Sequence, residues 1–321
     1  MIKDLATAQE IYQAIQRAAR ILAITHKQPD GDGLGALSAL GQYFKNQGKI
    51  YRLFCSDKVP ANYRFLPLSH EITNETKVFE ENFDLIIVVD AGDLTYAGVA
   101  DYLPKSFLAK LINIDHHQTN NRFGYLNLVE IGASSASEII YHLFRLWQVN
   151  INKEMATALL NGIIFDTGIF SNAGTTLEAL QAAAHLLNLG ARHKEINVNF
   201  LRNKSLGLLK LWGRAFERLQ FNERYNLAFT IITADDFKAC QVPLEAGSGL
   251  TNFFNELAGA DIAMLLVEQP NGGIKGSLRT TKDNIDLAAL ARLWGGGGHK
   301  KAAGFTVFGK LVYNGGRWAI I

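Results

Sequence analysis

The chain has 321 residues, of which 48% are apolar and 19% are charged, with 29 Gly and only 6 Pro. This composition excludes a disordered or collagen-like chain. The length exceeds the roughly 250–300 residues at which a single core stops growing, so two domains are expected. Because the formal net charge is only +2, a broad electrostatic grip on a long duplex is not indicated, and any anion site must be local.

The cysteines and the apolar runs bear on the compartment. Cys55 and Cys240 lie far apart in the sequence, which fits a reducing cytoplasm. The longest apolar runs, such as Leu85–Val89, fall far short of the ~20 residues needed to cross a bilayer. Residues 7–20 have amphipathic helical spacing, and no basic patch followed by an apolar stretch precedes them. We therefore expect a cytoplasmic protein with no membrane partner.

The first part of the chain alternates helix-period segments with short apolar runs, which is typical of an α/β domain with a largely parallel sheet. The predicted strands are Ile21–Thr25, Tyr51–Cys55, Leu85–Val89 and Leu111–Ile114. His26, Asp90 and Asp115 follow at the carboxyl ends of three of them. Open α/β sheets bind their ligands at these strand ends, so we expect the polar groups to meet in one crevice.

Beyond residue 134 the pattern becomes nearly all helical, and strands return later in the chain. The predicted helices are Ser137–Trp147, Glu154–Ile164, Leu177–Leu189, Leu206–Leu219 and Leu287–Trp294, and the predicted strands are Leu227–Ile232, Asp261–Val267, Ile274–Arg279 and Ala303–Phe308. We therefore expect an α/β protein in which an N-terminal parallel-sheet domain is followed by a helical linker and a smaller C-terminal α/β domain. The expected bounds are 1–190, 191–222 and 223–321.

A Pro- and Gly-rich turn, residues 26–33, follows the first predicted strand. Such a turn aims the side chains of His26, Asp30 and Asp32 into one space. An ordinary Pro-Asp-Gly turn, with Asp32 as the N-cap of the next helix, explains the same residues. This segment alone leaves both interpretations open.

Three further motifs place acidic or imidazole groups after apolar runs: Asp90-Ala91-Gly92-Asp93, Asp115-His116-His117 and Phe165-Asp166-Thr167-Gly168. A carboxylate at the end of a buried strand loses hydration, at a cost on the order of several kcal/mol that pairing or metal coordination must offset. With the first turn, these motifs supply a mixed oxygen and nitrogen set that suits two divalent cations of the manganese or magnesium type, and no thiolate that would favour structural zinc. The six residues of this set are His26, Asp30, Asp32, Asp90, His116 and Asp166.

These motifs, in this order, resemble those of the DHH phosphoesterases, in the branch that carries a DHHA1 domain, as in the bacterial nano-RNase/pAp-phosphatase proteins. The matching signatures are His26-x3-Asp30-x-Asp32, Asp90, the triplet Asp115-His116-His117, and Asp166. The glycine-rich stretch Gly295–Phe305 resembles the DHHA1 signature. The resemblance spans roughly residues 15–308.

The resemblance implies a role for each of these residues. One divalent cation, Mn²⁺ or Mg²⁺, would be held by His26, Asp30 and Asp90, and a second by Asp32, Asp90, His116 and Asp166. Asp90 would then bridge the two ions. His117 would lie outside the metal shell and contact a phosphate oxygen or protonate the leaving oxygen, so Asp90 and His117 are the expected catalytic residues. Asp115 would orient the histidines.

The glycine run offers backbone N–H groups without obstruction by side chains, which suits a terminal phosphate or a nucleotide. Taken alone, a flexible hairpin tip also explains four glycines. Together with a nearby arginine, the run resembles the substrate-binding wall of the family. The residues expected in this wall are Arg279, Gly297, Gly298, His299 and Lys300.

The activity implied by the resemblance is that of a metal-dependent phosphodiesterase and phosphatase. It would degrade very short single-stranded RNA, or small nucleotides such as pAp. A cyclic dinucleotide or its linear pNpN product is an alternative substrate. Two other kinds of enzyme share the metal-binding motifs but fit this chain less well. A RecJ-like exonuclease normally has a longer chain with an added OB fold, and a family II pyrophosphatase has a different second domain. A non-catalytic nucleotide-binding module would have lost metal ligands, and all six are present. Monomer and homodimer both remain open.

Overall fold

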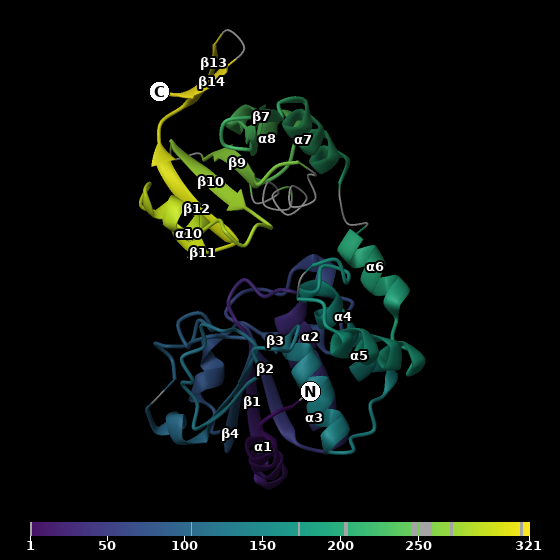
Figure 1. Ribbon diagram of the computed structural model, residues 1–321. Helices are drawn as coiled ribbons and strands as arrows, with labels where there is room; N and C mark the ends of the chain where they lie inside the picture. Colours follow the sequence, from purple (N-terminus) through teal and green to yellow (C-terminus); the bar gives the residue numbers. More distant parts are fainter. Residues whose placement is uncertain are drawn as a thin grey trace. The chain divides into compact units, whose positions relative to one another are not determined.

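The structure is a computed structural model that describes residues 2–103, 105–172, 174–201, 205–244, 250, 259–269, 272–314 and 317–321. The chain folds into two compact units, Met1–Asn203 and Lys204–Ile321, which we call the first and second unit. Each unit has its own six-stranded sheet (Figure 1). Among the described residues, no helix has the length and apolar character that a bilayer span requires.

The first unit confirms the expected parallel α/β domain. Its main elements are α1 (Leu5–Arg17), β1 (Arg20–Ile24), α2 (Gly31–Asn46), β2 (Ile50–Phe54), β3 (Ile72–Thr73), β4 (Leu85–Val89), β5 (Leu111–Asp115), β6 (Leu126–Val129), α3 (Ala136–Leu146), α4 (Lys153–Asp166), α5 (Leu177–Asn188) and α6 (His193–Leu201). The strands pair in parallel in the order β3-β2-β1-β4-β5-β6. The four predicted strands are β1, β2, β4 and β5. The short strands β3 and β6 were not predicted.

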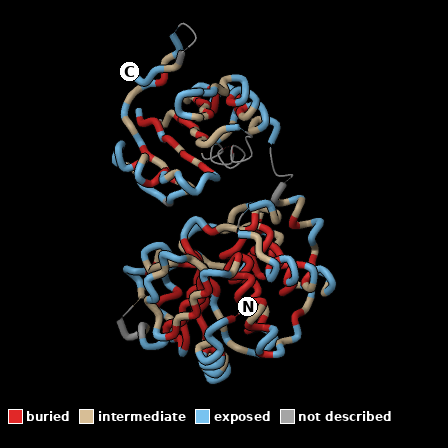
Figure 2. The backbone as a smooth tube through the Cα atoms, viewed as in Figure 1, coloured by how far each residue is buried: buried red, intermediate tan, exposed pale blue. Residues whose placement is uncertain are grey.

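The central position of β4 in the sheet explains why its sequence is uniformly apolar. Leu85, Ile87 and Val89 pack in the core shared with the helices, whereas Ile86 and Val88 belong to a separate core on the other face of the sheet. A central strand of a parallel sheet is covered on both faces, so successive side chains are all buried. Figure 2 shows this buried interior in red within the first unit.

The strand order reverses between β1 and β4, which are neighbours in the sheet although β2 and β3 separate them in the chain. In open α/β sheets, the ligand crevice lies at the carboxyl ends of the strands that flank such a reversal. His26 follows β1 closely, and Asp90 follows β4 directly. The topology therefore brings these two residues to the edge of the sheet where a ligand is expected.

The second unit is the smaller domain of mixed helices and strands. Its elements are α7 (Leu206–Glu217), β7 (Gln220–Asn222), β8 (Leu227–Ile232), α8 (Ala234–Cys240), β9 (Ile262–Glu268), β10 (Gly273–Arg279), α10 (Leu287–Arg292), β11 (Gly297–His299), β12 (Ala302–Phe308), β13 (Leu311–Asn314) and β14 (Arg317–Ile320). The main sheet has the order β11-β12-β10-β9-β8-β7, and β13 pairs with β14 in a separate hairpin. Only β8 and β9 pair in parallel among these described strands.

Candidate metal centre

The ring of His26 is oriented by its own loop. Its Nδ1 lies 2.9 Å from the carbonyl oxygen of Lys27, so this nitrogen carries the proton and donates it. The other nitrogen, Nε2, lies 3.6 Å from Asp30 Oδ1 and 3.4 Å from Asp90 Oδ2. Tyr96 stacks on the ring, with the centroids 5.0 Å apart and the planes within 9°. A hydrogen bond at one ring nitrogen leaves the other, here Nε2, available as a metal ligand.

Asp30 is the N-cap of α2, so the expected alternative of a turn capped by Asp32 is wrong. Oδ1 of Asp30 accepts the backbone N–H groups of Asp32 and Gly33, at 2.9 and 3.1 Å. Asp32 itself is fully buried, and its two oxygens accept the N–H groups of Ala136 and Ser137, at 2.6 and 2.8 Å. These N–H groups open α3, and a helix N-terminus stabilises a negative charge.

Gly162 of α4 lies against the carboxylate of Asp32. A Cβ atom at this position would lie 2.5 Å from Asp32 Oδ1 and closer still to Ser137 Oγ. Glycine inside a helix is less favourable than alanine by roughly 0.5–1 kcal/mol, so its presence in α4 reflects this close approach. Gly162 could not be predicted from the sequence, because nothing near it in the chain points to Asp32.

Asp90 lies between the two imidazoles, in a left-handed backbone conformation (φ 57°) that is strained for a residue other than glycine. Its Oδ2 faces His26, and its Oδ1 lies 3.5 Å from Nε2 of His116. The same Nε2 lies 3.1 Å from Asp166 Oδ2 and 4.0 Å from Asp32 Oδ2. The structure thus brings all six predicted metal residues together, as His26, Asp30 and Asp90 on one side and Asp32, His116 and Asp166 on the other.

Asp166 reaches this cluster from a helix. Its place after an apolar run groups it in the sequence with carboxylates at strand ends, but it is the last residue of α4. The apolar run before it is helical, and a helix that packs against α2 can present its final side chain to the same crevice as a strand does. The expected meeting of the side chains is therefore right, and so is the helix expected at Glu154–Ile164; only the grouping of Asp166 with carboxylates at strand ends is wrong.

Without metal ions, the carboxylates of the cluster perturb the pKa values of their neighbours. Burial lowers the pKa of His26, but the carboxylates of Asp30 and Asp90 outweigh burial and raise it to about 12. Burial also lowers the pKa of His116, but the neighbouring carboxylates outweigh burial and raise this pKa to about 12. Burial, followed by repulsion from other carboxylates, raises the pKa of Asp32 well above its ordinary value. The two imidazoles therefore do not balance the negative charge of the carboxylates, and the cluster favours the binding of further positive charge.

The donor atoms fit a divalent cation. Oδ1 of Asp90 and Nε2 of His116 are buried and, despite the short distances to their neighbours in the cluster, make no hydrogen bond of acceptable geometry within the described part of the chain. Leaving a buried polar atom unsatisfied costs ~1–3 kcal/mol, so such atoms normally have a partner. Carboxylate oxygens with imidazole nitrogens and no thiolate are the ligands of manganese or magnesium rather than of structural zinc. The cluster can thus hold metal ions.

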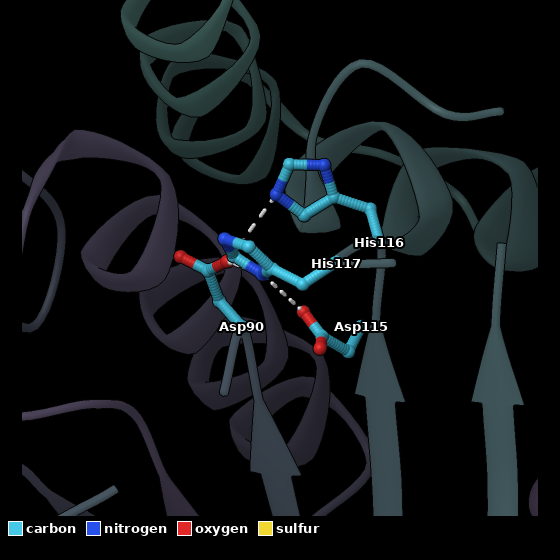
Figure 3. Close-up of side chains that lie close together, drawn as sticks. All are labelled: Asp90, Asp115, His116 and His117. Carbon is cyan, nitrogen blue, oxygen red and sulfur yellow. Dashed lines mark hydrogen bonds and ion pairs between the residues drawn. The ribbon is translucent and has the colours of Figure 1, made fainter. Parts of the chain in front are cut away.

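His117 turns its ring toward Asp115. Its Nδ1 lies 2.8 Å from Asp115 Oδ1 and 3.7 Å from Asp90 Oδ1, and Figure 3 shows the ring between these two carboxylates. The hydrogen bond with Asp115 raises the pKa of His117, against the opposing effect of burial. Because 42% of the His117 side chain is exposed and Asp115 is fully buried, His117 is the member of the pair that a substrate can reach.

The residues expected in the substrate-binding wall lie in the second unit. Arg279 ends β10 and is paired with Ala302 of β12, which is itself paired with His299 of β11, so the backbone positions form one row across three strands. The glycine run is not an open loop, because Gly297–His299 is strand β11. A Cβ atom on Gly298 would lie 2.6 Å from the carbonyl oxygen of Ala302. Close strand packing therefore explains this glycine, while Gly297 and Lys300 lie open at the surface.

Comparisons with known proteins agree with these features. Residues 20–163 match the N-terminal domain of the DHH family, and residues 245–310 match the DHHA1 domain, which confirms the resemblance seen in the motifs. The chain is 29% identical over 305 residues to the bifunctional oligoribonuclease and PAP phosphatase NrnA of Thermus thermophilus, covering 94% of this chain and 87% of that protein. It is 28% identical over 304 residues to the protein of the same name from Bacillus subtilis, covering 93% of each. The crystal structure of an exopolyphosphatase-related protein from Bacteroides fragilis superposes with a TM-score of 0.87 at 24% identity, over 95% of this chain and 92% of that one, which shows a shared fold.

Proposed function

We propose that this chain, which carries a DHH domain followed by a DHHA1 domain, is a metal-dependent phosphoesterase that hydrolyses very short oligoribonucleotides and small nucleotides such as pAp. The position of Asp90 carries the proposal, since its two oxygens face His26 on one side and His116 on the other. This is the arrangement that two adjacent ions require of a bridging carboxylate. Relatives named oligoribonuclease and PAP phosphatase, 28% and 29% identical over nearly the whole chain, support the substrate class.

We infer two divalent cations at this site, Mn²⁺ in preference to Mg²⁺. The proposed ligands are His26, Asp30 and Asp90 for one ion, and Asp32, Asp90, His116 and Asp166 for the other. When bound, such ions polarise the phosphoryl group and activate water for in-line displacement. The chain contributes rigidity, because backbone N–H groups of α2 fix Asp30 and those of α3 fix Asp32.

His117 is the proposed proton donor. In the hydrolytic step, a water oxygen forms a bond to phosphorus and releases one proton to solvent, while the bond from phosphorus to the departing sugar oxygen breaks. The proton on Nε2 of His117 moves to that oxygen, which leaves as a hydroxyl group. Asp115 accepts the hydrogen bond from Nδ1 of His117 and so keeps the ring in place.

The second unit is proposed to select the substrate. Cationic side chains near the glycine run suit a phosphate remote from the one that reacts, and a net charge of only +2 suits a short ligand better than a long duplex. The proposed contacts come from Arg279, Gly297, Gly298, His299 and Lys300. Both cysteines are free and buried, which is consistent with the proposed reaction taking place in the cytoplasm.

A substrate panel tests the proposal. The purified chain and Mn²⁺ are incubated with pAp, with end-labelled RNA and DNA from dimers to longer oligomers, with a cyclic dinucleotide, with pNpN and with pyrophosphate. We expect the highest initial rates on RNA dimers and pAp, and none after chelation. Asp90→Asn protein, purified in parallel, controls for contaminating nucleases. The fastest turnover on the cyclic dinucleotide or pNpN would favour the alternative phosphodiesterase. A preference for long single-stranded DNA would favour a RecJ-like exonuclease. Nucleotide binding without hydrolysis would favour a non-catalytic module.

A further inference from the structure

We propose that Asn120 is a positioning residue for this reaction, because through Asp115 it holds the ring of His117 in the orientation that delivers a proton to the leaving oxygen. The inference rests on the proposed function, in which His117 is the proton donor. Asn120 belongs to none of the sequence motifs described above. It ends a turn that follows the triplet, and its backbone N–H donates to the carbonyl oxygen of His117 at 3.1 Å.

Both ends of the side-chain amide of Asn120 make hydrogen bonds. Its Nδ2 donates to Oδ2 of Asp115 at 2.6 Å and to Oδ1 of Asn113 at 2.8 Å. Its Oδ1 accepts the backbone N–H of Arg122 at 2.7 Å. A backbone N–H can only donate, so the carbonyl end of the amide must face Arg122 and the NH₂ end must face Asp115. The partners therefore determine the orientation of this amide.

Asp115 connects Asn120 to His117. It is fully buried at the end of β5, with one oxygen accepting from Asn120 and the other facing Nδ1 of His117 at 2.8 Å. A buried carboxylate is costly unless its oxygens are hydrogen-bonded, so both contacts are needed to hold it there. Because Nδ1 faces a carboxylate, this nitrogen carries a proton and Nε2 is the atom presented to the substrate. Asn120 thus fixes Asp115, and Asp115 fixes the ring.

The neighbouring asparagine offers a matched control. Asn120→Asp keeps the shape of the side chain but replaces the NH₂ group by an oxygen that faces Oδ2 of Asp115. Repulsion between two carboxylates would displace Asp115 and release His117. Asn121 is the next residue and is exposed, so Asn121→Asp introduces the same charge one position further along without this contact.

The test compares two substrates with different needs for a proton. An RNA dinucleotide loses a sugar hydroxyl, which must be protonated, whereas bis(p-nitrophenyl) phosphate loses a phenolate that departs without a proton. We expect Asn120→Asp to lower kcat on the dinucleotide by about 10- to 100-fold, with KM within about threefold of the wild-type value. On the chromogenic substrate, kcat should change by less than about threefold. Asn121→Asp should behave as wild type on both substrates. If Asn120→Asp fails to fold, Asn120→Ala carries the same comparison.

A second background separates positioning from structure. If Asn120 acts through His117, then Asn120→Asp has no further effect in a chain that already carries His117→Ala. Additive losses, an equal loss on both substrates, or weaker Mn²⁺ binding by calorimetry in the Asn120 variant would overturn the inference. A wild-type chain that hydrolyses neither substrate with Mn²⁺ would instead contradict the proposed function, so the two failures are distinguishable.

Discussion

The two units both bury carboxylates but balance their charge in different ways. In the second unit, Asp236 accepts hydrogen bonds from Arg214 and Arg218 and from the backbone N–H of Thr233. In the first unit, the ion-pair partners found for Asp32 and the other clustered carboxylates among the described residues are imidazoles. A carboxylate paired with two guanidinium groups stabilises the fold that contains it. A cluster of carboxylates that shares two imidazoles is left with excess negative charge, which bound protons or a cation must balance, and such an excess is typical of a binding site rather than of a structural ion pair.

Removing the carboxylate shared by both proposed ions should have the largest effect. Asp90→Asn keeps the side-chain shape, and asparagine tolerates the left-handed backbone of this position better than alanine does. We expect Mn²⁺-dependent kcat to fall at least about 10³-fold, while the metal-free protein keeps its circular dichroism spectrum because charge repulsion is relieved.

Asp30→Asn provides the comparison, since asparagine still caps α2 and only one proposed ion loses a ligand. We expect Asp30→Asn to lower kcat less than Asp90→Asn does. Turnover of Asp90→Asn within tenfold of the wild-type rate would end the two-ion interpretation.

Asp236→Asn should affect stability and leave the chemistry unchanged. Because Arg214 and Arg218 remain partly exposed, we expect the free energy of unfolding of the second unit to fall by about 2–3 kcal/mol, less than for a fully buried pair. Hydrolysis of a small chromogenic phosphodiester should be unaffected. A change in Mn²⁺ affinity would contradict the assignment of Asp236 to the fold alone.

The contribution of Asp236 to the free energy of unfolding should depend on pH, and the pKa shift of Asp236 determines the direction. Burial raises the pKa of Asp236, but Arg218 and the other donors outweigh it and hold the pKa well below its ordinary value. The stabilisation by Asp236 is therefore fully present above the unfolded pKa of about 4 and is lost as pH falls toward the folded pKa. Denaturant titrations from pH 7 to pH 3 should show the difference between wild type and Asp236→Asn shrinking below about pH 4. A difference that grows on acidification would contradict this account.

Arg279→Ala tests whether the second unit acts on the substrate. We expect kcat/KM on RNA dinucleotides and pAp to fall by roughly ten- to hundred-fold, the effect of losing one charge-assisted hydrogen bond. A small chromogenic phosphodiester should lose far less, because it has no remote phosphate to bind. Arg292→Ala, at an exposed position of α10 in the same unit, is the control. An equal loss on both substrates would place Arg279 in the fold rather than in a binding surface.

Two helical glycines give the smallest predicted effects, of opposite sign in the two units. Gly162→Ala should lower the free energy of unfolding of the first unit by about 1–3 kcal/mol and weaken Mn²⁺ binding, because the new Cβ collides with Asp32. Gly213→Ala in α7 meets nothing within 4 Å and should raise stability by roughly 0.5–1 kcal/mol. Thermal unfolding with and without Mn²⁺ measures both. Stabilisation by Gly162→Ala would show that the contact with Asp32 is unimportant.

The sequence predicted the long helices and the strands with a clear apolar pattern. Strands such as β4 are covered on both faces, so an unbroken apolar run identifies them. The short strands β3 and β11 carry no such signal. Strand β11 consists of two glycines and a histidine, and its pairing with β12 depends on the close approach of Gly298 to Ala302 rather than on side-chain pattern.

For the candidate site, the sequence predicted the residue types and the strand ends that carry His26, Asp90 and Asp115, but not all of the contacts that hold the side chains. The six proposed ligands were found because carboxylates and imidazoles are unusual after buried runs. That Asp32 does not cap α2 depends on packing, because its carboxylate instead accepts N–H groups of α3, more than 100 residues away in the chain. Asn120 and Gly162 could not be found, since each acts through a side chain that only the folded structure brings close.

The spread of the ligands along the chain also fixes when the site can form during synthesis. His26 emerges from the ribosome early, whereas Asp166 is the final residue of α4 and emerges 140 residues later. The proposed ligands come from four separate segments of the chain, so the complete set comes together only after these segments have folded, unlike the closely spaced ligands of a zinc finger. Loading of the proposed site must follow the docking of α4 on α2, so its occupancy would mark that the chain has been made as far as the end of α4 and that these two helices have packed together.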